Sequence, residues 1–161
     1  MNALLIVAVC TLFSSTIAVD MSAVQPYDLT ATLMFLQEDT DSDGYLTVAE
    51  IDAVFAKYDQ NGDGRVSRRE YTTMLCDANP ALYQISHYLF DAYDVNHDHH
   101  LEVEDYEGFH AKMEVDGDGL VSQQEFVTYW VALFEDIETQ EAQHVHGNSH
   151  EHGHCPAAGK R

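Results

Sequence analysis

Two short acidic segments of this chain have the composition of a binding site for a hard metal ion. They are Asp39–Glu50, with the sequence DTDSDGYLTVAE, and Asp59–Glu70, with the sequence DQNGDGRVSRRE. Both place Asp or Asn at the first, third and fifth positions, glycine at the sixth and glutamate at the twelfth. Because oxygen atoms on such short side chains can surround a calcium ion from several directions, this spacing predicts calcium binding. Chance or a solvated acidic turn explains two such matches poorly.

Each position of these two loops has its own task. The sixth residue, Gly44 or Gly64, lies where the backbone turns sharply and a residue without Cβ is least strained. The seventh offers only a backbone carbonyl, the ninth acts directly or through water, and the twelfth reaches back with both carboxylate oxygens. The predicted ligands are Asp39, Asp41, Asp43, Tyr45, Thr47 and Glu50 in the first loop, and Asp59, Asn61, Asp63, Arg65, Ser67 and Glu70 in the second.

Two further loops, residues 94–105 and 114–125, depart from the pattern. His99 replaces the glycine of the third loop, where a left-handed backbone costs roughly 1–2 kcal/mol. Asp105 ends that loop and is shorter than glutamate, which favours magnesium over calcium; a decayed, structural loop is the alternative. The fourth loop differs only in its first residue, Glu114. The predicted ligands are Asp94, Asn96, Asp98, His100, Glu102 and Asp105 in the third loop, and Glu114, Asp116, Asp118, Leu120, Ser122 and Glu125 in the fourth.

The four loops resemble those of the EF-hand superfamily, over about residues 27–136. The resemblance implies an all-α fold, with a helix entering and a helix leaving each loop, and two to four bound calcium ions. In general character the chain is also similar to secreted calcium-binding proteins of invertebrates, including those of mollusc shell matrix. That similarity implies storage, transport or presentation of calcium outside the cell, in a mineralising matrix.

The spacing of the loops restricts the arrangement of the helices. The first two loops start 20 residues apart, as do the last two. The eight residues between Glu50 and Asp59 therefore form both the exit helix of hand 1 and the entry helix of hand 2. Hands 3 and 4 share a helix in the same way, and His110 within it is expected to be a partly buried, hydrogen-bonded histidine. A shared helix of about 11 residues is about 16 Å long, so the two loops at its ends cannot pair.

Loops 2 and 3 can pair. The 23 residues between them allow an exit helix, a corner at Asn79-Pro80 and an entry helix. We therefore predict a central lobe of hands 2 and 3, with loops 1 and 4 on its far side, paired through Leu46 and Val121. The whole forms one domain over residues 22–136, followed by a disordered, acidic to His-rich tail over 137–161. The entry helix of hand 1 spans residues 27–38, and its expected apolar residues are Leu29, Leu33, Met34 and Leu36.

The first 18 residues predict a secretory signal. An apolar run over residues 2–13 is followed by the sequence SSTIA, which suits cleavage after Ala18 and a mature chain from Val19. The chain ends in Lys160-Arg161 rather than an ER-retention signal, which favours export. A membrane anchor is the alternative, although the apolar run is short for a membrane span.

The chain is strongly acidic, with 28 acidic residues against 7 basic ones and a formal net charge of −21 at pH 7. Such a surface is unsuited to nucleic acid or acidic membranes, and suits basic matrix proteins or a cation-rich mineral surface. The sequence contains no nucleophile–base constellation and no open catalytic metal site, so an enzyme is not expected. The alternative to calcium storage is a calcium-responsive adaptor that exposes an apolar face to a protein partner.

The C-terminal tail predicts a second metal chemistry. Imidazole and thiolate ligands suit zinc or copper rather than calcium, so a loose transition-metal chelator is one interpretation and a plain polar tail the other. A bridge from Cys76 to Cys155, an intermolecular disulfide and two free thiols all remain open. The candidate ligands of the tail are His144, His146, His150, His152, His154 and Cys155.

Overall fold

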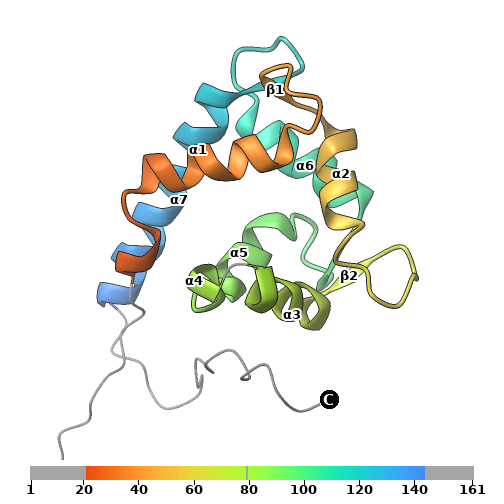
Figure 1. Cartoon of the computed structure of the whole chain (residues 1–161), viewed down its shortest axis with the longest axis horizontal. Coiled ribbons are helices and arrows are strands. Elements are labelled where there is room, and N and C mark those ends of the chain that lie inside the picture. Colours follow the sequence, from red (N-terminus) through yellow and green to blue (C-terminus); the bar gives the residue numbers. More distant parts are fainter. Residues whose placement is uncertain (1–20, 79, 144–161) are drawn as a thin grey trace, which may run out of the picture.

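The computed structural model describes residues 21–78 and 80–143, which form helices joined by loops and two small antiparallel ribbons (Figure 1). The predicted signal segment and most of the predicted tail lie outside the described residues. In chain order the elements are η1 (Met21–Val24), α1 (Tyr27–Glu38), β1 (Tyr45–Leu46), α2 (Val48–Phe55), β2 (Val66–Ser67), α3 (Arg68–Ala78), α4 (Pro80–Tyr83), α5 (Ser86–Tyr93), β3 (His100–Leu101), α6 (Val103–Met113), β4 (Val121–Ser122) and α7 (Gln123–Gln143).

The four loops are joined in two pairs by their two-residue strands. β1 pairs with β4, so that Leu46 lies opposite Val121. β2 pairs with β3, so that Val66 lies opposite Leu101. All four of these eighth-position residues are buried in one continuous core. The predicted pairings of loop 1 with loop 4 and of loop 2 with loop 3 are therefore confirmed.

A single helix connects the loops within each half of the chain. α2 runs from loop 1 to loop 2, α6 runs from loop 3 to loop 4, and the two helices pack against each other (Figure 1). α2 ends earlier than expected, at Phe55, because the backbone then tightens into a turn. In this turn the amide of Tyr58 donates to the carbonyl of Phe55 at 2.8 Å, three residues back rather than four.

Aromatic side chains connect the two ribbon-joined parts. Figure 1 shows α1 alongside α7, with α3, α4 and α5 on the other side of the molecule. Tyr93 of α5 lies between them, with its ring centroid 4.8 Å from that of Phe55 and 4.5 Å from that of Phe109. It also lies 5.7 Å from the ring of Trp130 on α7. Edge-to-face and tilted pairs of this kind add to the stabilisation from buried area.

The buried face of α1 differs from the expected one. Ala31 and Phe35 pack against α7, where the ring of Phe35 meets that of Phe126 edge-on at a centroid distance of 5.4 Å. Ala31 lies one turn before Phe35 on the same face of α1 and is fully buried with it. Most of the residues expected to be apolar contacts of this helix are instead exposed: Leu29 by 52%, Leu33 by 51% and Leu36 by 59%.

The predicted end of the domain at residue 136 was wrong. α7 continues to Gln143, because Ile137 follows Trp130 and Phe134 on the same helical face and is buried with them. The sequence also did not predict α4, a single turn that begins at Pro80. Across residues 21–78 and 80–143, no helix combines the length and apolarity needed to cross a bilayer.

His110 ties the shared helix α6 to the ribbon of loops 1 and 4. Its side chain is buried, and its Nε2 lies 3.1 Å from the backbone carbonyl oxygen of Leu46 in β1. The prediction of a buried, hydrogen-bonded histidine is confirmed.

The packing of the outer ribbon provides a test of the fold. Leu46→Ala removes a fully buried side chain and should lower the free energy of unfolding by about 2–5 kcal/mol. Leu36→Ala makes the same change on the exposed face of α1 and should alter it by less than about 0.5 kcal/mol. Urea unfolding of both variants measures the difference. Equal effects would contradict the arrangement of β1 against β4.

Candidate metal centres

Loop 1 gathers three carboxylates around one point. Oxygen atoms of Asp39, Asp41 and Asp43 all lie within 4.8 Å of one another. Backbone amides curl the loop around the first of them. The amide of Asp43 donates to Asp39 Oδ1 at 3.2 Å, and that of Gly44 donates to Asp39 Oδ2 at 3.0 Å. The sixth residue adopts the left-handed conformation expected of it, with φ of +89° at Gly44.

The last residue of loop 1 closes it from the other side. Glu50 lies in the first turn of α2, where it forms a capping box with Thr47. Its Oε1 accepts from the amide of Thr40 at 2.8 Å, and its Oε2 accepts from the amide of Thr47 at 3.0 Å. One carboxylate thus joins the beginning and the end of the loop.

The same closure recurs in loops 2 and 4. Glu70 accepts from the amides of Gln60 at 3.2 Å and Ser67 at 2.9 Å. Glu125 accepts from those of Val115 at 3.0 Å and Ser122 at 2.9 Å.

These hydrogen bonds keep the twelfth-position carboxylates charged. The bond from the Val115 amide, together with those from Ser122, lowers the pKa of Glu125 to about 2. Hydrogen bonds from Ser67 hold the pKa of Glu70 below its usual value. Burial opposes the shift at Glu50, but hydrogen bonds from Thr47 and Thr40 still lower its pKa.

Loop 2 uses an amide oxygen in place of its middle carboxylate. Asn61 Oδ1 accepts from the amide of Asp63 at 2.8 Å, which is the contact that Asp41 makes in loop 1. Asp59 accepts from the amides of Gly64 and Gly62, and these bonds lower its pKa. The donor set of this loop is therefore also built of oxygen atoms.

Loop 3 follows the same course despite its substitutions. Oxygens of Asp94, Asp98 and Asp105 lie within 4.8 Å of one another. The short side chain of Asp105 is fully buried and still accepts from the amides of Val95 at 2.9 Å and Glu102 at 3.2 Å. It reproduces the closure made by glutamate elsewhere by sitting deeper in the loop.

Histidines occupy both left-handed positions of loop 3. His99 has the positive φ predicted for it, +72°, and His97 has a φ of +64°. Sequence reasoning missed this second position, which is the fourth of the loop. The signal for it was the glycine at the same place in loops 2 and 4, Gly62 and Gly117. Loop 3 thus carries backbone strain that loops 2 and 4 avoid.

Loop 4 begins with the longer Glu114 and still converges. Its carboxylate lies within 4.8 Å of those of Asp116 and Asp118, and it accepts a hydrogen bond from the amide of Gly117. Asp118 in turn accepts from the amide of Leu120 at 2.8 Å.

The charge and chemistry of the loops fit a divalent cation with a preference for oxygen. Carboxylates held this close repel one another unless a cation lies between them. In the part of the chain that the structure describes, no Lys or Arg forms an ion pair with a loop carboxylate. The imidazoles of His99 and His100 lie 3.9 Å from Asp94 and 4.0 Å from Asp98, and each contact is an ion pair only when its imidazole is protonated. Calcium takes six to eight oxygens in flexible geometry, which such loops supply.

The predicted ligands at the seventh and ninth positions lie after the carboxylates of each loop. The seventh-position residues are Tyr45, Arg65, His100 and Leu120. At the ninth position, the hydroxyls of Thr47, Ser67 and Ser122 donate to the closing glutamates. The predicted transition-metal ligands of the tail, His144 to Cys155, lie outside the described residues. Cys76 is buried on α3 and takes part in a disulfide bond.

Comparisons with known proteins agree with this geometry. A family model described as EF hand matches residues 51–75, which span most of α2, loop 2 and the first part of α3. A relative from Arabidopsis thaliana, "Probable calcium-binding protein CML28", is 35% identical over 81 residues, which cover 50% of this chain and 74% of the relative. No solved structure matches the chain. The chain belongs to the EF-hand family.

The short closing residue of loop 3 can be tested directly. Asp105→Glu should raise the ratio of calcium affinity to magnesium affinity of this loop by roughly tenfold, because a longer side chain can offer calcium two oxygens. NMR titration of the His99 amide with each metal resolves this loop from the others. Glu107→Asp, on the exposed face of the same helix, is the matched control and should change neither affinity. An unchanged preference in Asp105→Glu would contradict the assignment.

Proposed function

We propose that this protein binds calcium through its four loops and stores, carries or presents the ion outside the cell. The observation that carries the proposal is the convergence of three acidic side chains in loops 1, 3 and 4, each loop closed by a twelfth-position carboxylate. The relative named for calcium binding supports the same ion.

The loops are expected to differ in affinity. Loops 1 and 2 have every residue of the pattern and are the primary sites. Loop 4 starts with a longer acid and loop 3 is strained, so these two bind more weakly. Extracellular calcium is near millimolar, and sites with Kd of about 10⁻⁴–10⁻³ M suffice there. The chain therefore binds two calcium ions when only loops 1 and 2 are occupied, and up to four when loops 3 and 4 fill as well.

The ribbons pair loops that belong to different halves of the chain. Ordering of loop 1 by calcium acts through β1 on β4, and hence on loop 4; loops 2 and 3 are coupled through β2 and β3. The weak loop of each pair therefore has a strong loop as its partner. This arrangement helps loops 3 and 4 to fill when loops 1 and 2 are occupied.

Calorimetry counts the working sites. Each of Asp39→Ala, Asp59→Ala, Asp94→Ala and Glu114→Ala removes the first ligand of one loop and should lower the calcium stoichiometry by one ion. Asp52→Ala, an exposed acid of α2 outside the loops, is the control and should leave the stoichiometry unchanged. Four variants with the stoichiometry of the unchanged chain would refute the proposal. An unchanged value for Asp94→Ala alone would make loop 3 structural.

The extracellular setting rests on the first 18 residues. Expression in a secretory cell should release a chain whose mass corresponds to a start at Val19, and Ala18→Arg should block that cleavage. The acidic surface of the released protein should bind a basic matrix protein or calcium carbonate particles, and added salt should release it. Retention of the uncleaved chain in the cell would contradict secretion.

A further inference from the structure

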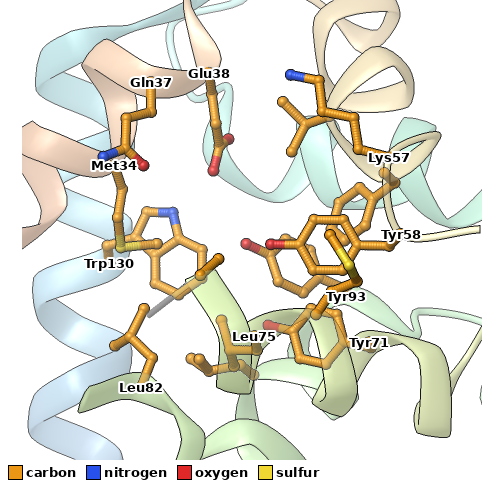
Figure 2. Close-up of a pocket in the computed structure, with 15 residues that line it drawn as sticks. Met34, Gln37, Glu38, Lys57, Tyr58, Tyr71, Leu75, Leu82, Tyr93 and Trp130 are labelled. Carbon is orange, nitrogen blue, oxygen red and sulfur yellow. The ribbon is translucent and has the colours of Figure 1, made fainter. Parts of the chain in front are cut away.

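The two parts of the molecule that the ribbons join are not packed together evenly. On one side a cavity of about 320 Å³ separates them, with Met34 and Trp130 along one wall and Tyr58, Tyr71 and Tyr93 along the other (Figure 2). Within the described part of the chain, the residues that line it come from α1 to α5, the turn after α2, and α7, and none comes from α6. Because packed contacts carry a structural change from one part to another, α6 is better placed than the cavity side to do so.

α6 donates a hydrogen bond to each of the two ribbons. The hydroxyl of Tyr106, near its start, lies 3.2 Å from the carbonyl oxygen of Leu101 in β3, and Nε2 of His110 lies 3.1 Å from the carbonyl oxygen of Leu46 in β1. Tyr106 and His110 are four residues apart, so they lie on one face of the helix, and both are buried. Because a carbonyl oxygen can only accept, His110 carries hydrogen on Nε2.

The His110 bond acts on the peptide group beside the metal ligands of loop 1. Its acceptor, Leu46, follows Tyr45, whose carbonyl is a predicted ligand. The carbonyl of Leu46 belongs to the same peptide group as the amide of Thr47, which donates to Glu50 Oε2 at 3.0 Å. Hydrogen bonds at the two ends of one peptide group polarise it and strengthen each other. His110 thus holds the part of loop 1 that positions the closing carboxylate.

The Tyr106 bond has the same place in loop 3. Its acceptor, the carbonyl of Leu101, shares a peptide group with the amide of Glu102, which donates to Asp105 Oδ2 at 3.2 Å. Asp105 itself lies in the first turn of α6. One face of α6 is therefore bonded to loop 3 in the inner ribbon and to loop 1 in the outer ribbon, at corresponding points of the two loops.

The other shared helix has no such donors at the corresponding positions. Tyr106 and His110 are the thirteenth and seventeenth residues counted from the start of loop 3, and Ile51 and Phe55 of α2 are those counted from the start of loop 1. Both residues of α2 are buried and apolar, and the ring of Phe55 stacks on that of Tyr106 with the planes 5° apart. A shared helix can thus pack without the two hydrogen bonds, so they are a separate property of α6.

We infer, on the basis of the proposed calcium binding, that α6 couples the two pairs of sites, with Tyr106 and His110 as positioning residues and not as ligands. A cation in loop 3 orders Asp105 and the start of α6, and His110 passes this order to the carbonyl of Leu46. Loop 1 then binds calcium more tightly when loop 3 is filled, and by linkage loop 3 binds more tightly when loop 1 is filled. The ribbons by themselves join loops only within each pair.

Calcium titration followed by NMR of single amides tests the role of His110. The amides of Gly44 and Gly64 donate to the first ligands of loops 1 and 2, so each reports on its own loop. His110→Leu removes the donor and keeps a side chain that can be buried, and it should weaken loop 1 roughly tenfold while changing loop 2 by less than about twofold. His110→Gln keeps an N–H at a similar reach and should restore loop 1 to within about twofold.

Tyr106 allows the smallest change, the loss of one oxygen atom. Tyr106→Phe should weaken loop 3 by roughly threefold to tenfold, measured at the amide of His99, which donates to the first ligand of that loop. Tyr129→Phe makes the same change in another partly buried tyrosine, on α7, and should leave loop 3 unchanged.

A double-mutant cycle tests the coupling itself. Asp94→Ala empties loop 3 and should weaken calcium binding at loop 1 by roughly threefold to tenfold. Combined with His110→Leu, the same change should leave loop 1 unaffected further, because the connection is already lost. Glu114→Ala is the matched control: loop 4 acts on loop 1 through β4 and β1, so its effect should be equal with and without His110→Leu.

Four results would each overturn the inference. They are hydrogen on Nδ1 of His110 in nitrogen NMR of the unmodified chain, no effect of Asp94→Ala on loop 1, an undiminished effect of Asp94→Ala in His110→Leu, and equal weakening of loops 1 and 2 in His110→Leu. The first two need no variant of α6, so they decide the matter even if His110→Leu fails to fold. A chain that binds no calcium refutes the proposed function, whereas a chain whose loops 1 and 3 fill independently refutes only the coupling.

Discussion

The eight residues between the end of loop 1 and the start of loop 2 constrain the whole molecule. They are too few for two helices and a turn, so a single helix, α2, has to leave one loop and enter the next. A helix holds its ends apart, and the two loops it joins face away from each other. Each loop still has an apolar eighth residue to bury, and the partner for it has to come from the other half of the chain. The segment that forms α6 is equally short, so the eighth residues of loops 3 and 4 also cannot pair with each other. Pairing of loop 1 with loop 4 and of loop 2 with loop 3 buries all four of these residues.

The packing between the ribbons follows from that arrangement. α1 and α7, which flank loops 1 and 4, lie together, and α3 and α5, which flank loops 2 and 3, lie opposite. Tyr93 and Trp130 close part of the space between these layers, and the central cavity is what remains of it. The C-terminal end of α1 borders both the cavity and a metal loop, because Glu38 lines the cavity and the next residue, Asp39, is the first predicted ligand of loop 1.

Local features were predictable from the sequence, and so was the pairing of the loops. The carboxylates of each loop occupy fixed positions in a short segment, so chain geometry alone brings Asp39, Asp41 and Asp43 together. Helix length was enough to place Leu46 opposite Val121. The buried face of α1 was not predictable, since it depends on which side of the helix meets α7, the side of Ala31 and Phe35, and not on the number of leucines. Nor was the cavity, because Glu38, Tyr93 and Trp130 come from three helices far apart in the sequence.

The alternation of helix and ribbon also has a mechanical meaning. Loop 1 is joined to loop 2 by α2, loop 2 to loop 3 by a ribbon, loop 3 to loop 4 by α6, and loop 4 back to loop 1 by the other ribbon. The connections form a closed ring of four members, and the first and last helices both leave the ring at the outer ribbon. Tension applied to the free ends of α1 and α7 would therefore load the packing between these helices first, where Tyr27 meets Phe134, and then β1 against β4. The ribbon of β2 and β3, with its two loops, stays unloaded until the outer one opens, so the inner pair of sites is mechanically shielded by the outer pair.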